Sequence, residues 1–184
     1  MREYRSYFLT PYGPGVVIAT DQGVAGVELP DVSRCDRVCH LVPLESEQSD
    51  ISTRSALLLQ RYFHGERADF SDIPVDLSNL PPFRQNILNM IRKLAFGEIC
   101  SYGQLAELCG SPRAARAVGG ALAANPVPVI IPCHRVVASD GRLTGFSAPG
   151  GVNAKKALLQ LEGIELNGMV VVTNQLVMHR TSSR

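Results

Sequence analysis

The sequence predicts a small α/β domain over residues 1–82, followed by a mainly α-helical domain with a helix-turn-helix over residues 83–184. Two β-rich runs and one amphipathic helix make up the first part, whereas helix patterns follow one another in the second. Adjacent prolines, Pro81 and Pro82, favour a boundary between them. Charge supports this division, because residues 1–82 carry 7 basic and 12 acidic side chains, whereas residues 83–135 carry 6 basic and 2 acidic ones.

The composition excludes several classes of protein. The chain has 184 residues and a formal net charge of +1, with 45% hydrophobic and 19% charged residues, which is typical of a globular protein and not of a disordered one. No apolar run reaches about 18 residues and no apolar core lies near the start, so we expect neither a membrane-spanning helix nor a secretory signal. Five cysteines are an odd number for a disulfide framework and favour a reducing compartment, so we expect a cytoplasmic protein.

The elements of the first part follow from local patterns. Residues 15–20 and 24–29 are β-rich runs around Asp21-Gln22-Gly23, which predicts a hairpin. Residues 49–64 predict a helix whose apolar side chains fall on one face, and Gly65 is suited to end it.

The second part begins with an apolar stripe from Phe83 to Leu94, which predicts a helix closed by Gly97. Ser101 can cap a short helix that runs to Leu108. The remaining expected elements are a helix that starts at Ser111-Pro112 and runs to about Ala124, a tight hairpin over residues 136–143 around Asp140-Gly141, and a final helix over residues 149–162.

Two short helices joined around Gly110 have the layout of a helix-turn-helix. The same pattern also fits an ordinary αα-corner, which is more common. The excess of basic side chains in this region fits attraction to a polyanion, or an uneven distribution of surface charge with no partner.

Residues 131–137 contain Cys133 between proline and histidine, and these residue types fit an activated nucleophile. Neighbouring side chains on a strand point to opposite faces, so Cys133 and His134 meet only if the chain turns there. Pro132 is compatible with such a turn. On these residues alone, a buried structural cysteine beside a half-buried histidine is the more common arrangement.

The run Pro-Cys-His-Arg-Val at residues 132–136 resembles the active-site motif of the O6-alkylguanine-DNA alkyltransferases, the methylated-DNA–protein-cysteine methyltransferases. The resemblance is convincing over residues 83–163, whereas residues 1–82 fit the family only in layout. It implies a ribonuclease H-like N-terminal domain and a winged-helix-like C-terminal one. The other matching positions are residues 96–99, Ser101, Tyr102, residues 114–121, Asn125, Pro126, Pro128, Lys155, Leu158, Leu159, Glu162 and Gly163.

The resemblance implies DNA repair in which an O6-alkyl group passes irreversibly from guanine to Cys133. Each molecule would react once, as a methyltransferase that is consumed. His134 resembles the base that deprotonates the thiol through a bound water, and Glu162 resembles the carboxylate that orients it. Tyr102 resembles the residue that protonates or hydrogen-bonds N3 of the leaving base. Arg135 resembles a buried structural arginine.

The resemblance also implies contacts to the base and the duplex. The target base lies inside double-stranded DNA and must be flipped out. Asn125 resembles a hinge residue, and Arg116 resembles the arginine that fills the vacated stack, although a phosphate contact also fits it. Leu122 fits a wedge beside the flipped base or a core residue. The implied substrate-binding residues are Asn125, Val136, Phe146 and Ser147, and the implied DNA-binding residues are Ala115, Arg116, Gly119, Gly120 and Leu122.

Some positions depart from the family pattern and concern the substrate range. Phe146 stands where many members have tyrosine, and residues 147–151 form a loop two residues longer than in some members. Ala123 and Ala124 lack a basic residue that some relatives have there. The expected partner is double-stranded DNA with O6-alkylguanine, with O4-alkylthymine as a further candidate, and the protein is expected to be a monomer. A lesion sensor and a cysteine hydrolase are the competing functions.

Cys35, Cys39 and His40 have the residue types of a zinc site. Zinc prefers four ligands, and His64 is the only obvious fourth, in a spacing that matches no strong motif. We therefore expect no metal. No phosphate-binding loop or dinucleotide motif is present, so we expect no cofactor.

Overall fold

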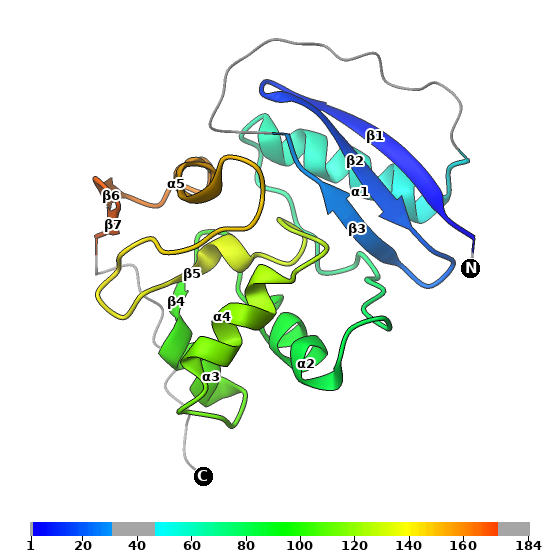
Figure 1. The fold of residues 1–184 in the computed structure, drawn as a ribbon. Coiled ribbons are helices and arrows are strands. Elements are labelled where there is room, and N and C mark those ends of the chain that lie inside the picture. Colours follow the sequence, from blue (N-terminus) through cyan, green and yellow to red (C-terminus); the bar gives the residue numbers. More distant parts are fainter. Residues whose placement is uncertain (1, 31–46, 173–184) are drawn as a thin grey trace.

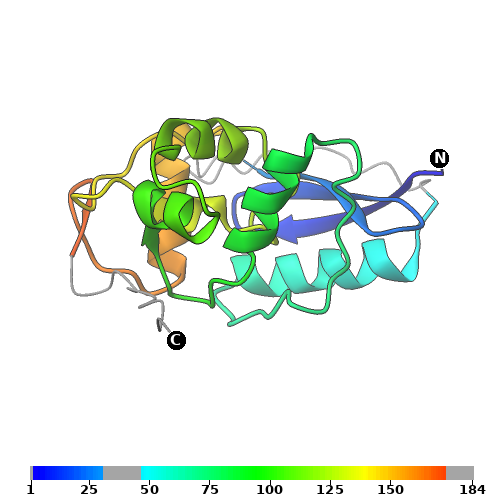
Figure 2. The same ribbon diagram turned by 90° about the horizontal axis from the view of Figure 1, so that it is seen from below.

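The computed structural model describes residues 2–30 and 47–172, and its first half is an antiparallel sheet covered by one helix (Figure 1). The strands β1 (Tyr4–Thr10), β2 (Gly13–Ala19) and β3 (Val24–Glu28) pair in the order β1-β2-β3. Helix α1 (Asp50–Phe63) runs along one face of this sheet (Figure 2). The predicted hairpin and helix are confirmed, and β1 is an additional strand that the sequence patterns did not reveal.

Local side chains explain why the first half takes this form. Ser49 caps α1, because its side chain accepts from the Ser52 backbone N–H while the Ser52 side chain accepts from that of Ser49. Gly65 follows the helix with a φ of +83°, a left-handed conformation that favours glycine. In the sheet, Gly15 lies opposite Phe8, and a Cβ at Gly15 would lie 2.2 Å from the Phe8 ring. The glycine therefore leaves the space that Phe8 needs to stack on Phe63 of α1.

The second half is mainly helical, with short strand pairs between the helices (Figure 1). The strands β4 (Cys100–Ser101) and β5 (Val136–Val137) pair in parallel, and β6 (Leu166–Asn167) and β7 (Val170–Val171) pair antiparallel. The elements are α2 (Pro82–Ile91), β4 (Cys100–Ser101), α3 (Tyr102–Leu108), α4 (Ala115–Ala123), the 3-10 turn η1 (Cys133–Arg135), β5 (Val136–Val137), α5 (Gly151–Leu161), β6 (Leu166–Asn167) and β7 (Val170–Val171).

Two predicted helix boundaries are wrong by several residues. α2 ends at Ile91 and not near Gly97, because the chain then forms tight turns in which Leu94 N donates to Ile91 O. α4 begins at Ala115 and not at Ser111-Pro112, because Ser111 O accepts from Ala114 N and closes a turn before the helix. Both start and stop signals mark a change of chain direction, but not the residue at which helical hydrogen bonding begins or ends.

The predicted hairpin over residues 136–143 is only partly correct. The turn is present, since Gly141 N donates to Ala138 O and Gly141 has a φ of +79°. Its two sides do not pair as strands, because β5 pairs with β4 and Arg142 pairs with Val170 of β7. A turn motif therefore specified the reversal of the chain, whereas burial against distant segments decided the strand partners.

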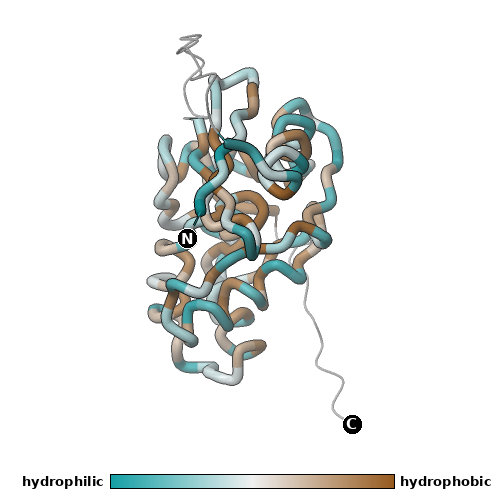
Figure 3. Tube along the Cα trace, turned by 90° about the vertical axis from the view of Figure 1, so that its right-hand side faces the viewer, coloured by the Kyte–Doolittle hydropathy of each residue, from teal (hydrophilic) through white to brown (hydrophobic). Residues whose placement is uncertain are grey.

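One hydrophobic cluster runs through both halves of the chain and includes Phe8 and Phe63 as well as Ile87, Val118 and Cys133. Hydrophobic stretches, in brown, lie in the interior of the molecule between hydrophilic ones in teal (Figure 3). The loop after α4 is also tied to the sheet, since Val27 N donates to Pro126 O at 2.8 Å. This loop leads to Cys133, so the first half of the chain supports the segment of chemical interest. None of the described helices is long and apolar enough to cross a membrane.

Candidate active site

Cys133 opens the η1 turn, between the loop after α4 and strand β5. Pro132 precedes it, and Pro132 O accepts from Arg135 N at 3.0 Å. The chain therefore turns at this position, as an interaction between Cys133 and His134 requires. Cys133 is 6% exposed and lines a cavity, whereas His134 is fully buried.

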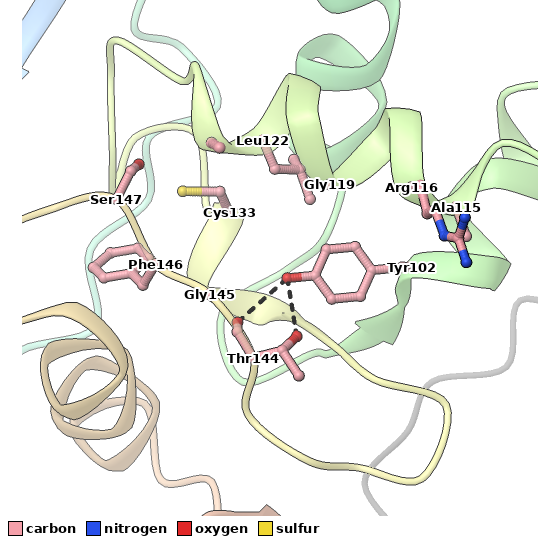
Figure 4. Close-up of a pocket in the computed structure, with 11 residues that line it drawn as sticks. Tyr102, Ala115, Arg116, Gly119, Leu122, Cys133, Thr144, Gly145, Phe146 and Ser147 are labelled. Atoms are coloured by element: carbon pink, nitrogen blue, oxygen red, sulfur yellow. Dashed lines mark hydrogen bonds between the residues drawn. The ribbon is translucent and has the colours of Figure 1, made fainter.

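The cavity beside Cys133 has a volume of about 600 Å³ and lies between α3, α4 and the loop before α5. Phe146 and Ser147 lie on one side of Cys133 and Tyr102 lies on the other, with Arg116 at the far end (Figure 4). Arg116 is exposed and stands in the first turn of α4, not in the middle of a longer helix as expected, because α4 starts late. The lining residues are Tyr102, Ala115, Arg116, Gly119, Leu122, Ala123, Cys133, Thr144, Gly145, Phe146 and Ser147.

A buried ionic network adjoins Cys133 and is centred on Glu162, the C-cap residue that follows α5. Arg135 holds both carboxylate oxygens, with Nε 2.7 Å from Oε2 and Nη2 2.9 Å from Oε1. His134 Nε2 lies 2.7 Å from Oε1. Burial by itself raises the pKa of Glu162, but the charges and hydrogen bonds of His134 and Arg135 outweigh it and hold the pKa well below the ordinary 4.5. Glu162 is therefore an anion throughout the physiological range.

This anion determines which nitrogen of His134 carries the proton. A carboxylate only accepts hydrogen bonds, so we assign the proton of the neutral imidazole to Nε2, which faces Glu162. The other nitrogen, Nδ1, then has a free lone pair, and it has no hydrogen-bond partner among the described protein atoms. Burial lowers the pKa of His134 below its ordinary 6.5, although the Glu162 carboxylate opposes the shift. His134 is therefore a neutral base near pH 7.

The Cys133 thiol is buried but has polar neighbours. Burial raises its pKa, whereas a hydrogen bond from Asn125 and the charge of Lys155 act in the opposite direction. Asn125 Nδ2 lies 3.1 Å from Sγ and also donates to Ile131 O at 2.9 Å, while its Oδ1 accepts from Val127 N. The amide is thus held on three sides. The thiol stays protonated at rest and needs a base to become a thiolate.

Lys155 is a functional candidate that the sequence analysis matched to the family without giving it a role. Its ammonium group is buried and donates to Val136 O at 2.6 Å and to Thr144 O at 2.9 Å. Burial lowers its pKa from 10.5 to about 8, although the cysteines Cys133 and Cys100 oppose the shift. One pattern could have revealed it: helical spacing places Lys155 on the same face as Leu158 and Leu159, where a lysine is unusual.

Tyr102 is held at the cavity by the loop opposite it. Its hydroxyl lies 3.4 Å from both the carbonyl and the hydroxyl oxygen of Thr144 (Figure 4). Lys155 Nζ lies 5.7 Å from the centre of its ring, a cation–π contact. The ring also lies against α4, where a Cβ at Gly119 would be 3.8 Å from it.

The other predicted residues take different places relative to the cavity. Val136 is fully buried and its side chain is not among the lining residues, although its carbonyl binds Lys155. Gly120 is exposed on α4 outside the cavity. Leu122 lines the cavity but is only 5% exposed, so it is part of the core as well. Arg135 is buried in the network, as the family pattern implied.

The described residues contain no group of three or more side chains that could hold a metal ion. The zinc candidates Cys35, Cys39 and His40 lie outside the described residues. Cys100 and Cys109 are free thiols, and burial raises the pKa of Cys100 to about 12. Cys100 is therefore an unreactive thiol within β4.

Comparison with known proteins identifies the family. The chain is 35% identical over 163 residues to the methylated-DNA–protein-cysteine methyltransferase of Haemophilus influenzae, an alignment that covers 88% of this chain and 87% of the relative. The chain belongs to this methyltransferase family. It is also 37% identical to the family member of Metallosphaera sedula, over 89% of this chain and 94% of the relative.

Family models and solved structures cover both halves of this methyltransferase. Residues 4–77 match the ribonuclease-like domain of 6-O-methylguanine DNA methyltransferase, and residues 82–164 match its DNA-binding domain. The Mycobacterium tuberculosis O6-methylguanine methyltransferase has a similar fold, with a TM-score of 0.67 at 32% identity over 88% of this chain and 93% of that one. A structure of the M. tuberculosis protein in complex with DNA gives a TM-score of 0.68 at 31% identity, over 86% of this chain and 92% of that one.

Proposed function

We propose that the protein repairs DNA by flipping O6-alkylguanine out of the duplex and taking its alkyl group irreversibly onto Cys133. One observation supports this proposal above the others. Cys133 lines a cavity beside α4, and the next residue, His134, belongs to the buried network with Glu162 and Arg135. The reactive thiol therefore faces the cavity, whereas the base next to it in sequence, His134, lies in the buried ionic network. Family membership supports the same reaction.

In the proposed reaction, a bond forms between Sγ and the alkyl carbon while the bond from that carbon to O6 of guanine breaks. The thiol proton passes through one bound water to Nδ1 of His134, the nitrogen with the free lone pair. Glu162 stabilises the imidazolium that forms. Asn125 and Lys155 stabilise the thiolate, whose charge burial otherwise disfavours.

The leaving guanine takes up the electron pair of the broken bond. Tyr102, at the cavity wall, gives N3 of this base a proton or a hydrogen bond and so stabilises the charge that develops. Ser147 and Phe146 line the cavity on the other side of Cys133 and bind the base through their backbone and ring. Val136 contributes its backbone and not its side chain, because that side chain is buried away from the cavity.

The face of α4 at the cavity mouth is proposed to bind the minor groove of the duplex. Gly119 and Ala115 allow close approach of a backbone, and Gly120 lies exposed beside them. Arg116 fills the stack that the flipped base leaves. Leu122 forms the apolar floor beside the flipped base and not an exposed wedge, since it is buried.

Several finer expectations belong to the same proposal. We propose that the protein acts as a monomer in the cytoplasm and that its domains divide near Pro81 and Pro82, which the extent of the two family models supports. Phe146 and the longer loop over residues 147–151 are proposed to set the range of alkyl groups and the repair of O4-alkylthymine. Phe146 lacks a hydroxyl, so recognition there depends on packing alone.

The experiment that tests this function is an intact-mass measurement after incubation with a duplex that carries one O6-methylguanine. A gain equal to one CH2 group, mapped to Cys133 and absent with an undamaged duplex, is the expected result. Binding of the lesion with no change in mass would contradict transfer and indicate a sensor. Repeated turnover of small acyl esters without DNA would indicate a cysteine hydrolase instead.

Arg116→Ala is expected to slow methyl transfer from duplex DNA by about thirtyfold, because the gap left by the flipped base is no longer filled. Transfer from a free O6-alkylguanine base should change by less than about twofold, since no stack has to be opened. Arg54→Ala is the matched control, because it removes the same charge from an exposed site on α1. Equal losses on duplex and free base would contradict a role in base flipping. Stopped-flow quenching with both substrates checks the result.

A further inference from the structure

Tyr62 is a buried polar side chain that the reaction described above does not use. It lies in the last turn of α1, 72 residues from His134 and 100 residues from Glu162 in sequence, and is 1% exposed. Its hydroxyl nevertheless reaches the network that adjoins Cys133. It donates to Glu162 Oε1 at 2.9 Å and lies 3.5 Å from His134 Nε2. The first half of the chain therefore contributes directly to the surroundings of the base.

The Tyr62 ring is held in place from several sides. Phe63 meets it edge-on with ring centres 5.3 Å apart, and Phe70 and Phe96 lie 6.1 and 6.3 Å away. These contacts aim the hydroxyl at one carboxylate oxygen. Burial and the neighbouring Glu162 raise the pKa of Tyr62 well above its ordinary value of 10.0. Tyr62 is therefore a neutral hydrogen-bond donor at every pH at which the protein works.

The oxygen that Tyr62 binds is the one that also faces His134. Glu162 Oε1 accepts from Tyr62, His134 Nε2 and Arg135 Nη2, whereas Oε2 accepts from Arg135 Nε and Gly97 N. A donor on Oε1 fixes the carboxylate and spreads its charge, so less of this charge is left to stabilise the imidazolium. Among the described residues, the charged groups that act on Tyr62 are Glu162 and Arg135, and those that act on His134 are Glu162, Arg135 and Lys155.

We propose that Tyr62 is a positioning residue for alkyl transfer, whose hydroxyl fixes Glu162 and restrains its pull on His134, so that the first half of the chain sets the acid limit of Cys133 reactivity. This inference rests on the proposed function, because it takes His134 to be the base. Tyr62 does not touch the substrate in this proposal. Its effect passes through Glu162 to His134.

Tyr62→Phe keeps the ring and removes only the donor. The transfer rate falls in acid as His134 becomes protonated, and we call this part of the pH profile the acid limb. In Tyr62→Phe we expect the acid limb to shift to higher pH by about one unit, which makes transfer about tenfold slower at a given pH on that limb. On the alkaline plateau the rate should stay within about twofold of the wild type, because His134 is neutral there in both proteins. The measurement is single-turnover methyl transfer from a duplex with O6-methylguanine, followed from about pH 5 to about pH 9.

Phe70→Leu is the matched control, because Phe70 packs against the same ring and its side chain has no group that could donate a hydrogen bond to Glu162. It should lower thermal stability and leave the pH profile in place. A uniform loss of rate at every pH in Tyr62→Phe would reduce Tyr62 to a packing role and overturn the proposal. So would an unchanged profile in a folded Tyr62→Phe protein.

Cys133 reactivity can also be followed without DNA, and the Tyr62 hydroxyl can be altered without removing it. Labelling of Cys133 by iodoacetamide in the absence of DNA, followed by peptide mass, reports the same acid limb. It therefore separates failure of this inference from failure of the DNA repair function. If Tyr62→Phe does not fold, 3-fluorotyrosine placed at position 62 retains the ring and makes the hydroxyl a stronger donor. The acid limb should then move down, and a shift upward or no shift would contradict the proposal.

Discussion

Cys133→Ser is expected to lower methyl transfer by at least about ten-thousandfold while lesion binding persists. A serine hydroxyl is far less acidic than a thiol, and His134 is a weak base that cannot generate an alkoxide in this setting. The cavity itself should be little changed, because the substitution replaces one sulfur atom by oxygen and Cys133 is only one of the residues that line the wall. Intact mass after incubation with methylated duplex measures transfer, and fluorescence anisotropy measures binding.

The control for this variant is Cys109→Ser. Cys109 ends α3, is only partly buried, and is not among the residues that line the cavity. Its loss should leave the rate and the extent of methylation unchanged. Methylation of Cys133→Ser at another cysteine, or normal transfer by it, would show that Cys133 is not the acceptor.

Glu162→Gln is expected to lower the free energy of unfolding by about 3–5 kcal/mol, because it leaves the buried Arg135 without its counter-ion. Glutamine offers one carbonyl oxygen and one NH2 group in place of two acceptor oxygens. Its NH2 group must therefore face a donor that now binds one of the carboxylate oxygens. Transfer should also slow by about a thousandfold, because the imidazolium of His134 loses the charge that stabilises it. Urea denaturation and single-turnover kinetics measure the two effects.

Glu66→Gln gives the comparison for an exposed ion pair. Glu66 Oε2 lies 2.7 Å from Arg61 Nε, the same distance as between Glu162 and Arg135, but both side chains are more than half exposed. Its loss should cost less than about 1 kcal/mol, because solvent screens the pair. Similar losses in the two variants would mean that the Glu162 network is not desolvated in solution.

The stability difference between wild type and Glu162→Gln should depend on pH in one direction. Because the pKa of Glu162 is lower in the folded protein than its ordinary 4.5, the unfolded chain takes up the proton first as pH falls. The contribution of Glu162 is thus fully present above about pH 4.5 and is lost as pH falls through the folded value. The gap between the two proteins should narrow in acid, and a gap that widens would contradict the assigned charge.

Local sequence signals predicted the elements that depend on neighbouring residues. Ser101 caps the helix it was expected to cap, the helix expected over residues 49–64 is present, and the turn at Asp21-Gln22-Gly23 joins two strands. The signals failed where distant contacts compete with local ones. The segments on either side of Gly141 take their partners from β4 and β7 and not from each other, and the apolar side chains of Val136, Val137 and Leu143 are buried there.

The sequence by itself identified the family to which this protein belongs and predicted Cys133 as its reactive residue. A cysteine in the run Pro-Cys-His-Arg-Val, with the spaced motifs around it, was sufficient for both. Only the tertiary structure decided the surroundings that make this cysteine chemically competent. Glu162 lies 28 residues from His134, Lys155 donates to the carbonyl of Val136, and Tyr62 reaches Glu162 from another part of the chain. Hydrogen bonds in a buried site depend on distance in space, and no local pattern of residues encodes that distance.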